Sequence, residues 1–319
     1  MISMYRIALV IVLVSCALII CTSCNKEPKK DFIGIEGISF DNYPKVDGST
    51  SARALNQMVA CKLLGIRYEW SNYFSEEWYL ISEDIPNKYE NFLWEQIKTS
   101  QTHGAFMNLI DGDADVILTH RTISPDERAH ADAVGVTLIE TSIASDAFVF
   151  VVHPNNPVKS LKVDEIQKIY TKEITSWSEV GGNNSDISVY SRPRNSGSEE
   201  VFRTLVMKGL EPFNFPEAVQ INPMYGVFVT VFNDEHGICY TFNNYAEVIA
   251  RIPDVPKLSI NGIFPDDGTV KRSIYPFISE LYVSIRSDLD RNSMAYKLYE
   301  WLQSENAKST IIECGFIPK

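Results

Sequence analysis

The sequence lacks the patterns that mark several common classes of protein. Its five histidines form no His-x-His or His-Glu-x-x-His pair, so no familiar zinc motif is present. No Gly-x-Ser-x-Gly segment occurs, which disfavours a serine hydrolase. Basic residues are outnumbered, with 29 Lys and Arg against 41 Asp and Glu, and the net charge of -12 disfavours nucleic-acid binding. We therefore expect a non-enzymatic protein without metal or cofactor.

Long hydrophobic runs are also scarce. The uncharged run at residues 7–21 has 15 residues, fewer than the ~20 that a membrane-spanning helix needs. It follows Arg6 and ends in small residues, which is typical of a secretory signal. Because a cysteine stands where the chain turns polar, the junction resembles a bacterial lipobox. We expect lipidation at Cys24, with residues 1–23 as signal peptide and 24–31 as tether.

Other readings of the N-terminus stay open. Cys21 stands where the lipobox pattern usually has Leu, and Cys16 also follows a matching segment, so either could carry the lipid. An uncleaved membrane anchor is a further alternative. In each case we expect the rest of the chain outside the cytoplasm, facing the periplasm or the cell exterior.

Cysteine is sparse in the remainder of the chain. Cys61, Cys239 and Cys314 are an odd set without close spacing, so they form no disulfide framework. Cys61 lies on a helical apolar face and Cys239 in a strand-like run, which predicts that both are buried.

The hydrophobic content of 45% predicts a globular chain, and about 300 residues after the signal suffice for two domains. Apolar periodicity predicts strands at 32–40, 116–118, 136–139, 148–152, 187–190, 237–242 and 281–285, and helices at 52–64, 163–170, 199–208 and 293–302. A further short helix is expected at 105–110. This alternation predicts an α/β fold with mostly parallel sheets and helices on both faces. Ligands of such sheets bind where strands end and helices begin.

Three segments place hydroxyl residues and glycine directly before a predicted helix. They are Ser49-Thr50-Ser51, Thr102-His103-Gly104 and Asn195-Ser196-Gly197-Ser198. A helix start leaves about four backbone N–H groups unpaired and carries about half a positive charge, so it binds anions without a basic side chain. The same residue types are also the best helix N-caps. Each segment alone therefore indicates capping as readily as binding.

Two arginines add to this pattern. Arg192 follows the strand at 187–190, close to the third segment, and a guanidinium can hold a phosphate with two parallel hydrogen bonds. Arg121 and His120 follow the strand at 116–118. Arg121 or His120 could add an anion contact, and for Arg192 and Arg121 the alternative is a side chain that faces solvent.

These residues resemble a known family. Residues 46–51 resemble the first anion-binding loop of ABC-type periplasmic phosphate-binding proteins, and residues 190–198 resemble their second loop, an Arg followed by Ser-Gly-Ser at a helix start. Residues 151–158, 174–182 and 237–240 are similar to framework segments of the same family. The similarity covers nearly the whole chain after the signal.

The resemblance implies a type 2 periplasmic-binding-protein fold, a two-domain clamshell that encloses an anion. Domain I is expected at residues 32–145 plus 243–319 and domain II at 146–242, with hinge strands near 144–148 and 240–242. The ligand residues that it implies, with Arg121 as an added cation, are Ser49, Thr50, Ser51, Thr102, His103, Arg121, Arg192, Ser196, Gly197 and Ser198. The implied partners are inorganic phosphate, ABC transporter permease subunits and, through the lipid, the membrane. We expect a monomer.

Two departures from the family leave the ligand open. Phosphate receptors place carboxylates in the site, but this chain has Arg194 at one such position and Thr119-His120-Arg121 at another. Sulfate or another tetrahedral oxyanion is therefore an alternative to phosphate. A signalling or adhesion receptor on the same fold is a second alternative, and a phosphate-ester hydrolase is a third.

Overall fold

A computed structural model describes residues 33–73, 75–82, 84–252 and 255–319, and residues 34–319 form one compact unit. The expected signal peptide, the tether at 24–31 and the lipidation candidates Cys16, Cys21 and Cys24 lie outside the described residues. Within the described ranges, no helix has both the length and the apolar character that crossing a membrane requires.

The chain alternates short strands with helices. The strands are β1 (Val46–Gly48), β2 (Glu69–Ser71), β3 (Tyr79–Ile81), β4 (Val116–Thr119), β5 (Leu138–Val152), β6 (Ser160–Leu161), β7 (Ser188–Val189), β8 (Gly237–Phe242), β9 (Ser259–Ile260), β10 (Ile278–Arg286) and β11 (Ile317–Pro318). The α-helices are α2 (Arg53–Leu64), α3 (Phe92–Glu95), α4 (Gln101–Asp111), α5 (Pro125–Ala133), α6 (Val163–Tyr170), α7 (Gly197–Val201), α8 (Gly226–Phe232), α9 (Asp267–Lys271), α10 (Met294–Leu302) and α11 (Lys308–Glu313). Shorter 3₁₀ turns are η1 (Thr50–Ala52), η2 (Asn87–Tyr89), η3 (Trp177–Val180) and η5 (Glu217–Val219), and π-helical turns are η4 (Phe202–Met207) and η6 (Tyr245–Ala250).

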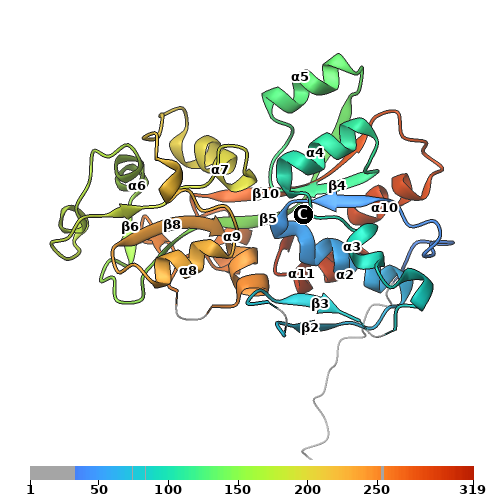
Figure 1. Cartoon of the computed structure of the whole chain (residues 1–319), viewed down its shortest axis with the longest axis horizontal. Coiled ribbons are helices and arrows are strands. Elements are labelled where there is room, and N and C mark those ends of the chain that lie inside the picture. The colour runs from blue at the N-terminus through green and yellow to red at the C-terminus, as the bar shows by residue number, and fades with distance from the viewer. Residues whose placement is uncertain (1–32, 74, 83, 253–254) are drawn as a thin grey trace, which may run out of the picture. The chain divides into compact units, whose positions relative to one another are not determined.

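One seven-stranded sheet runs through the compact unit, in the order β1-β4-β10-β5-β8-β7, with β11 also paired to β5. Helices pack on both faces: in Figure 1, α4 and α5 lie on one side of β1 and β4, and α2 and α11 on the other. The α/β class with helices on both faces is therefore confirmed.

The expectation of mostly parallel sheets is wrong for the middle of this sheet. The edge pairs β1–β4 and β7–β8 are parallel, but β10 runs antiparallel to β4 and β5, and β5 runs antiparallel to β8 and β11. The cause is the long strand β5, which leaves one half of the sheet while β10 returns to it. Two neighbouring strands that cross in opposite senses must be antiparallel.

Strand β5 divides the unit into two lobes. Its residues 138–147 pair with β10 and its residues 148–152 pair with β8. Separate hydrophobic cores lie on either side of this crossing. The first-lobe core contains residues of β1, β4, β10, α2, α10 and α11, and the second-lobe core contains residues of β7, β8, α6, α8 and the end of β5. A smaller cluster of α4 and α5 residues completes the first lobe.

Core packing bears on where the second lobe ends. Residues of η6 and the segment that follows it, from Tyr245 to Phe277, belong to the second-lobe core. The chain therefore stays in the second lobe after β8 and returns to the first lobe at β10. We propose residues 146–277 as domain II, in place of the expected end at residue 242.

Most predicted elements are present. Helices α2, α6 and α10 lie within one residue of the predicted bounds at both ends, and α2 is closed by Gly65 with a positive φ of 69°. The strands predicted at 136–139 and 148–152 are the two ends of β5. The strand predicted at 32–40 is wrong: the described residues there form turns, and the first strand is β1. Its apolar side chains Ile35, Ile38 and Phe40 pack against the first-lobe core instead.

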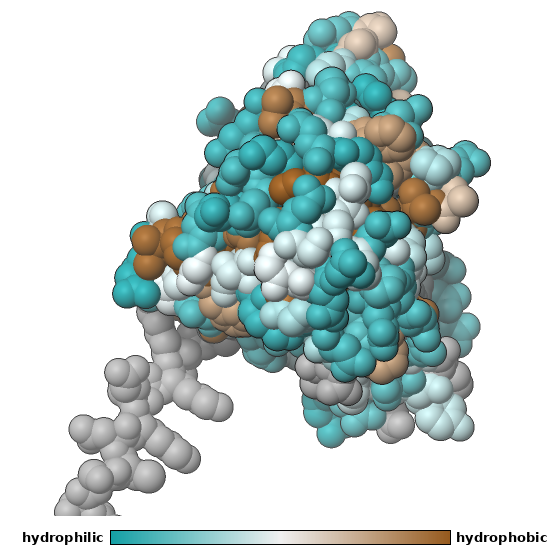
Figure 2. Space-filling model, turned by 90° about the vertical axis from the view of Figure 1, so that its left-hand side faces the viewer, coloured by the Kyte–Doolittle hydropathy of each residue, from teal (hydrophilic) through white to brown (hydrophobic). Residues whose placement is uncertain are grey.

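Burial of the cysteines is confirmed, because Cys61, Cys239 and Cys314 are free and buried. The face of the second lobe in Figure 2 is mainly hydrophilic, and its apolar side chains form small separate groups. The apolar residues of this lobe are thus gathered mainly in its core.

A buried carboxylate ties the first lobe together near the sheet edge. Asp47 of β1 is fully buried. Its Oδ1 accepts hydrogen bonds from the backbone N–H groups of Gly48 (2.7 Å) and Ser100 (2.8 Å), and its Oδ2 accepts one from the Asn108 amide (2.7 Å). These bonds hold the start of α4 against the end of β1, so they fix two of the three predicted helix starts relative to each other.

We expect Asp47→Ala to lower the free energy of unfolding by about 2–4 kcal/mol, because three donors lose their buried acceptor. Urea denaturation monitored by circular dichroism measures this. Asp47→Asn retains one acceptor oxygen and should cost less. An alanine variant as stable as the wild type would contradict this role of Asp47.

Candidate functional site

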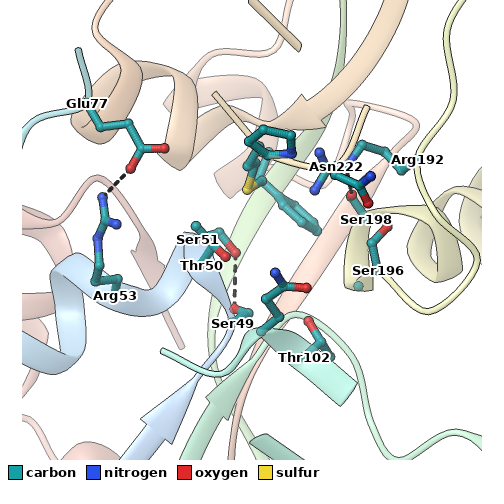
Figure 3. A pocket seen from close by; sticks show the side chains of 15 residues that line it. Ser49, Thr50, Ser51, Arg53, Glu77, Thr102, Arg192, Ser196, Ser198 and Asn222 are labelled. Atoms are coloured by element: carbon teal, nitrogen blue, oxygen red, sulfur yellow. Dashed lines mark hydrogen bonds and ion pairs between the residues drawn. The ribbon is translucent and has the colours of Figure 1, made fainter. Parts of the chain in front are cut away.

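A cavity of about 210 Å³ lies between the two lobes, at the strand ends and helix starts (Figure 3). Eight of the ten predicted ligand residues line it: Ser49, Thr50, Ser51, Thr102, Arg192, Ser196, Gly197 and Ser198. Its other lining residues are Arg53, Glu77, Gln101, Asn222, Pro223, Met224 and Phe242. The structure thus brings all three predicted segments to one place, although their role as ligands stays a prediction.

The first segment enters the cavity from β1. A Cβ on Gly48 would lie 2.6 Å from the Leu118 carbonyl oxygen, so glycine is needed where β1 approaches β4. The chain then turns through η1 into α2. Ser49 occupies the N-cap position but its side chain makes no capping bond; instead its hydroxyl lies 3.1 Å from the Ser51 hydroxyl. Capping therefore does not account for these two hydroxyls.

The second segment belongs to α4, which starts earlier than predicted. The expected helix start at residue 105 is wrong, because the helix already begins at Gln101 and Thr102 lies in its first turn. Gln101 has a positive φ of 63°, a conformation that costs energy for a residue with a side chain and that is often found at functional sites. The Asp47 bond to Ser100 holds the chain just before this residue.

The third segment begins α7 in the second lobe. The Ser196 side chain caps this helix by accepting a hydrogen bond from the Glu199 N–H (3.2 Å). Gly197 faces the first lobe so closely that a Cβ on it would overlap the Thr102 side chain. The starts of α4 and α7 therefore touch across the cleft, and the lobes are closed on this side.

Arg192 supplies the positive charge of the cavity. Its side chain is buried, with 8% of the residue exposed. It donates from Nε to the Ser198 hydroxyl (3.2 Å) and from Nη1 to the Ile221 carbonyl (2.6 Å). Burial lowers the pKa of this guanidinium below its usual value, but an arginine stays charged in proteins. No ion pair to Arg192 is found among the described residues.

The sequence prediction missed a charged pair in the lining. Arg53, the first residue of α2, forms an ion pair with Glu77 (Nη2 to Oε2, 2.6 Å). Glu77 also accepts a hydrogen bond from the Tyr245 hydroxyl of the second lobe (2.7 Å). Arg53 could have been found from its position just after the first segment, whereas Glu77, in the loop between β2 and β3, gives no sequence signal.

The loop and hairpin around Glu77 close the other side of the cleft. The Trp78 N–H donates to the Ile249 carbonyl of η6 (2.8 Å). The Arg251 guanidinium lies over the rings of Trp70 (4.7 Å) and Trp78 (4.5 Å). Together with the Tyr245 bond, these contacts join β2 and β3 of the first lobe to the second lobe.

Two predicted ligand residues lie elsewhere. Arg121 makes two 2.7 Å hydrogen bonds to the fully buried carboxylate of Glu127 and an ion pair across the cleft to Glu200 of α7. His103 points to the same carboxylate, with its Nδ1 2.9 Å from Glu127. The prediction that they line the anion site is corrected, because Glu127 satisfies both. Arg194 is exposed and does not line the cavity either.

The lining chemistry suits binding better than catalysis. None of the lining residues is a histidine, lysine or aspartate, so the Ser and Thr hydroxyls have no base except Glu77, which Arg53 and Tyr245 already engage. Among the described residues, no cluster of His, Cys, Asp and Glu could hold a metal ion.

Comparison with solved structures bears out the fold. A protein of phosphate ABC transporter type from Clostridium perfringens, solved with bound phosphate, matches with a TM-score of 0.63 at 21% identity, over 87% of this chain and 100% of that one. An ABC-type phosphate transport receptor from Vibrio cholerae matches with a TM-score of 0.60 at 22% identity, over 85% and 98%. The type 2 periplasmic-binding-protein fold is therefore confirmed.

Sequence comparison identifies distant relatives. The phosphate-binding protein PstS of Bacillus subtilis is 27% identical over 182 residues, which is 57% of this chain and 58% of that protein. The alignment thus spans less than two thirds of the relative's length. The model of the PBP superfamily domain matches residues 83–305, more than half of the chain. The resemblance to phosphate-binding proteins is confirmed as distant homology, and the protein belongs to the PBP superfamily.

Proposed function

We propose that this protein binds inorganic phosphate in the cavity between its lobes, outside the cytoplasm, and delivers it to an ABC transporter. The observation that carries the proposal is the buried guanidinium of Arg192, which lines the cavity without an ion-pair partner among the described residues. An unpaired buried charge costs several kcal/mol, and an anion in the cavity offsets that cost.

The donors around Arg192 fit a tetrahedral oxyanion. The hydroxyls of Ser49, Thr50 and Ser51 come from the first lobe, and Ser198 comes from the second. Hydroxyl groups turn to suit an oxygen acceptor, and bonds from Arg192 to an anion are charge-assisted and therefore strong. The Bacillus subtilis relative is a phosphate-binding protein, which supports phosphate as the anion.

Sulfate is the second candidate. Phosphate carries a proton near neutral pH that an acceptor in the site would recognise, and Glu77 is the one carboxylate in the lining. Both of its oxygens already accept hydrogen bonds, from Arg53 and from Tyr245. The arrangement therefore favours a tetrahedral anion more firmly than it favours phosphate over sulfate.

The cellular setting is part of the proposal. Lipidation at Cys24 would hold the protein at the membrane surface, next to the permease subunits that receive the anion. The relatives and similar structures, which are phosphate-binding and phosphate-transport proteins, support a transport role over signalling or adhesion.

Calorimetric titration of residues 25–319, stripped of anions by unfolding and refolding, tests the anion. We expect phosphate to bind, and Arg192→Ala to weaken binding at least about thirtyfold, because truncating a buried charged partner typically costs 2–5 kcal/mol. Sulfate titrated in parallel decides between the two anions. A folded protein that gives no heat with either anion would refute the proposal.

Closure of the cleft yields a second test. Gly197→Ala adds a methyl group where the Thr102 side chain lies, so the lobes cannot meet. We expect phosphate affinity to fall at least about tenfold, or 1.4 kcal/mol, with little change in the unfolding of the anion-free protein. Small-angle scattering at saturating phosphate should show a larger radius of gyration than for the wild type.

A second substitution controls for this steric cause. Thr102→Ala in the Gly197→Ala background removes the overlapping hydroxyl and should restore part of the compaction seen by scattering. Wild-type affinity in the single variant would show that the contact between α4 and α7 is not needed for binding.

A further inference from the structure

The cavity is larger than one tetrahedral anion requires. Its volume is about 210 Å³, whereas an engineered cavity of about 150 Å³ in another protein accepts benzene. The lobes are in contact on both sides of the cavity, because Thr102 touches Gly197 on one side and Glu77 bonds to Tyr245 on the other. A phosphate held at Arg192 therefore leaves space beside it in the cavity.

The two ends of this space differ in chemistry. Figure 3 shows Arg192, Ser196 and Ser198 at one side and the Arg53–Glu77 pair at the opposite side, with Ser49 to Ser51 between them. The lining also contains three apolar side chains, Pro223, Met224 and Phe242, which offer no hydrogen-bond donor to an oxyanion. An unsubstituted oxyanion binds through hydrogen-bond donors, so it would form no hydrogen bonds with these three apolar side chains.

The far end carries no net charge. Arg53 and Glu77 neutralise each other at 2.6 Å, and Glu77 is held further by the Tyr245 hydroxyl. A second anionic group placed here would meet the Glu77 carboxylate, whereas hydroxyl groups could bond to either member of the pair. The end therefore suits a small, uncharged group.

We propose that the cavity accepts a monosubstituted phosphoryl compound, a phosphomonoester or phosphonate with a small uncharged substituent. The phosphoryl group lies at Arg192 and the substituent extends along Met224 toward the Arg53–Glu77 pair. This inference rests on the proposed function, because it uses the same phosphoryl site.

Calorimetric titration of the anion-stripped wild type with a ligand series tests the inference. The series is inorganic phosphate, methyl phosphate, methylphosphonate, glycerol 3-phosphate and 2-phosphoglycolate. We expect the ligands with uncharged substituents to bind within about tenfold of phosphate and to compete with it. Comparing the affinities for methyl phosphate and methylphosphonate shows whether the cavity prefers a phosphomonoester or a phosphonate. Because 2-phosphoglycolate carries a carboxylate, it should bind at least about tenfold more weakly than glycerol 3-phosphate.

Two variants locate the substituent. Arg192→Ala should lose every ligand of the series. Met224→Trp fills the apolar wall, so the ratio of glycerol 3-phosphate affinity to phosphate affinity should fall at least about tenfold. An unchanged ratio in the folded variant would overturn the placement along Met224.

The outcomes separate this inference from the proposed function. If phosphate binds through Arg192 but all substituted ligands bind more than about a hundredfold more weakly, the inference fails and the proposed function stands. If 2-phosphoglycolate binds as well as glycerol 3-phosphate, the restriction to uncharged substituents fails. If no phosphoryl ligand binds, both fail.

Discussion

The buried guanidinium of Arg192 sets the chemistry of this cleft, and it forms no ion pair with any carboxylate that the structure describes. Arg192 follows β7 in the second lobe, and its described hydrogen bonds go to a hydroxyl and a carbonyl, neither of which carries a full charge. Most buried arginines are matched by a carboxylate, because an uncompensated buried charge is costly. Arg121 of the same chain has such a carboxylate partner, because the buried Glu127 accepts two hydrogen bonds from its guanidinium. The contrast between these two arginines separates a structural ion pair at Arg121 from the proposed anion site at Arg192.

The strands and contacts around Arg192 explain why a cavity is present between two lobes that touch. The crossing strands β5 and β10 connect the lobes through one continuous sheet. The contacts that close the cleft lie at its two rims, at the starts of α4 and α7 and at the loop that carries Glu77. Asp47 holds the start of α4 to the end of β1, so the first-lobe donors keep their spacing. Contacts at both rims around a cavity lined by hydroxyl groups and Arg192 suit the proposed enclosure of an anion.

Local sequence patterns predicted which loops line the cavity, but they did not predict the contacts between the lobes. Ser49 to Ser51 and Ser196 to Ser198 could be found because helix starts have a local signature. Arg121 lies away from the cavity because it pairs with Glu127, and the capping box Ser124-x-x-Glu127 explains this glutamate locally without indicating the ion pair. Glu77 was missed because a loop residue shows no periodicity. The strand directions and the return at β10 depend on pairing between distant segments, which a single sequence does not display.

The most direct test of the central claim is the free energy of unfolding of the wild type and of Arg192→Met, measured by urea denaturation with and without phosphate. Methionine has a similar length and no charge, so without anion the variant should be at most about 1 kcal/mol less stable than the wild type. At a phosphate concentration of a hundred times the wild-type Kd, phosphate should stabilise the wild type by about 2.7 kcal/mol and the variant by less than about 1 kcal/mol. Equal stabilisation of both proteins by phosphate would show that the buried charge of Arg192 is not what holds the anion.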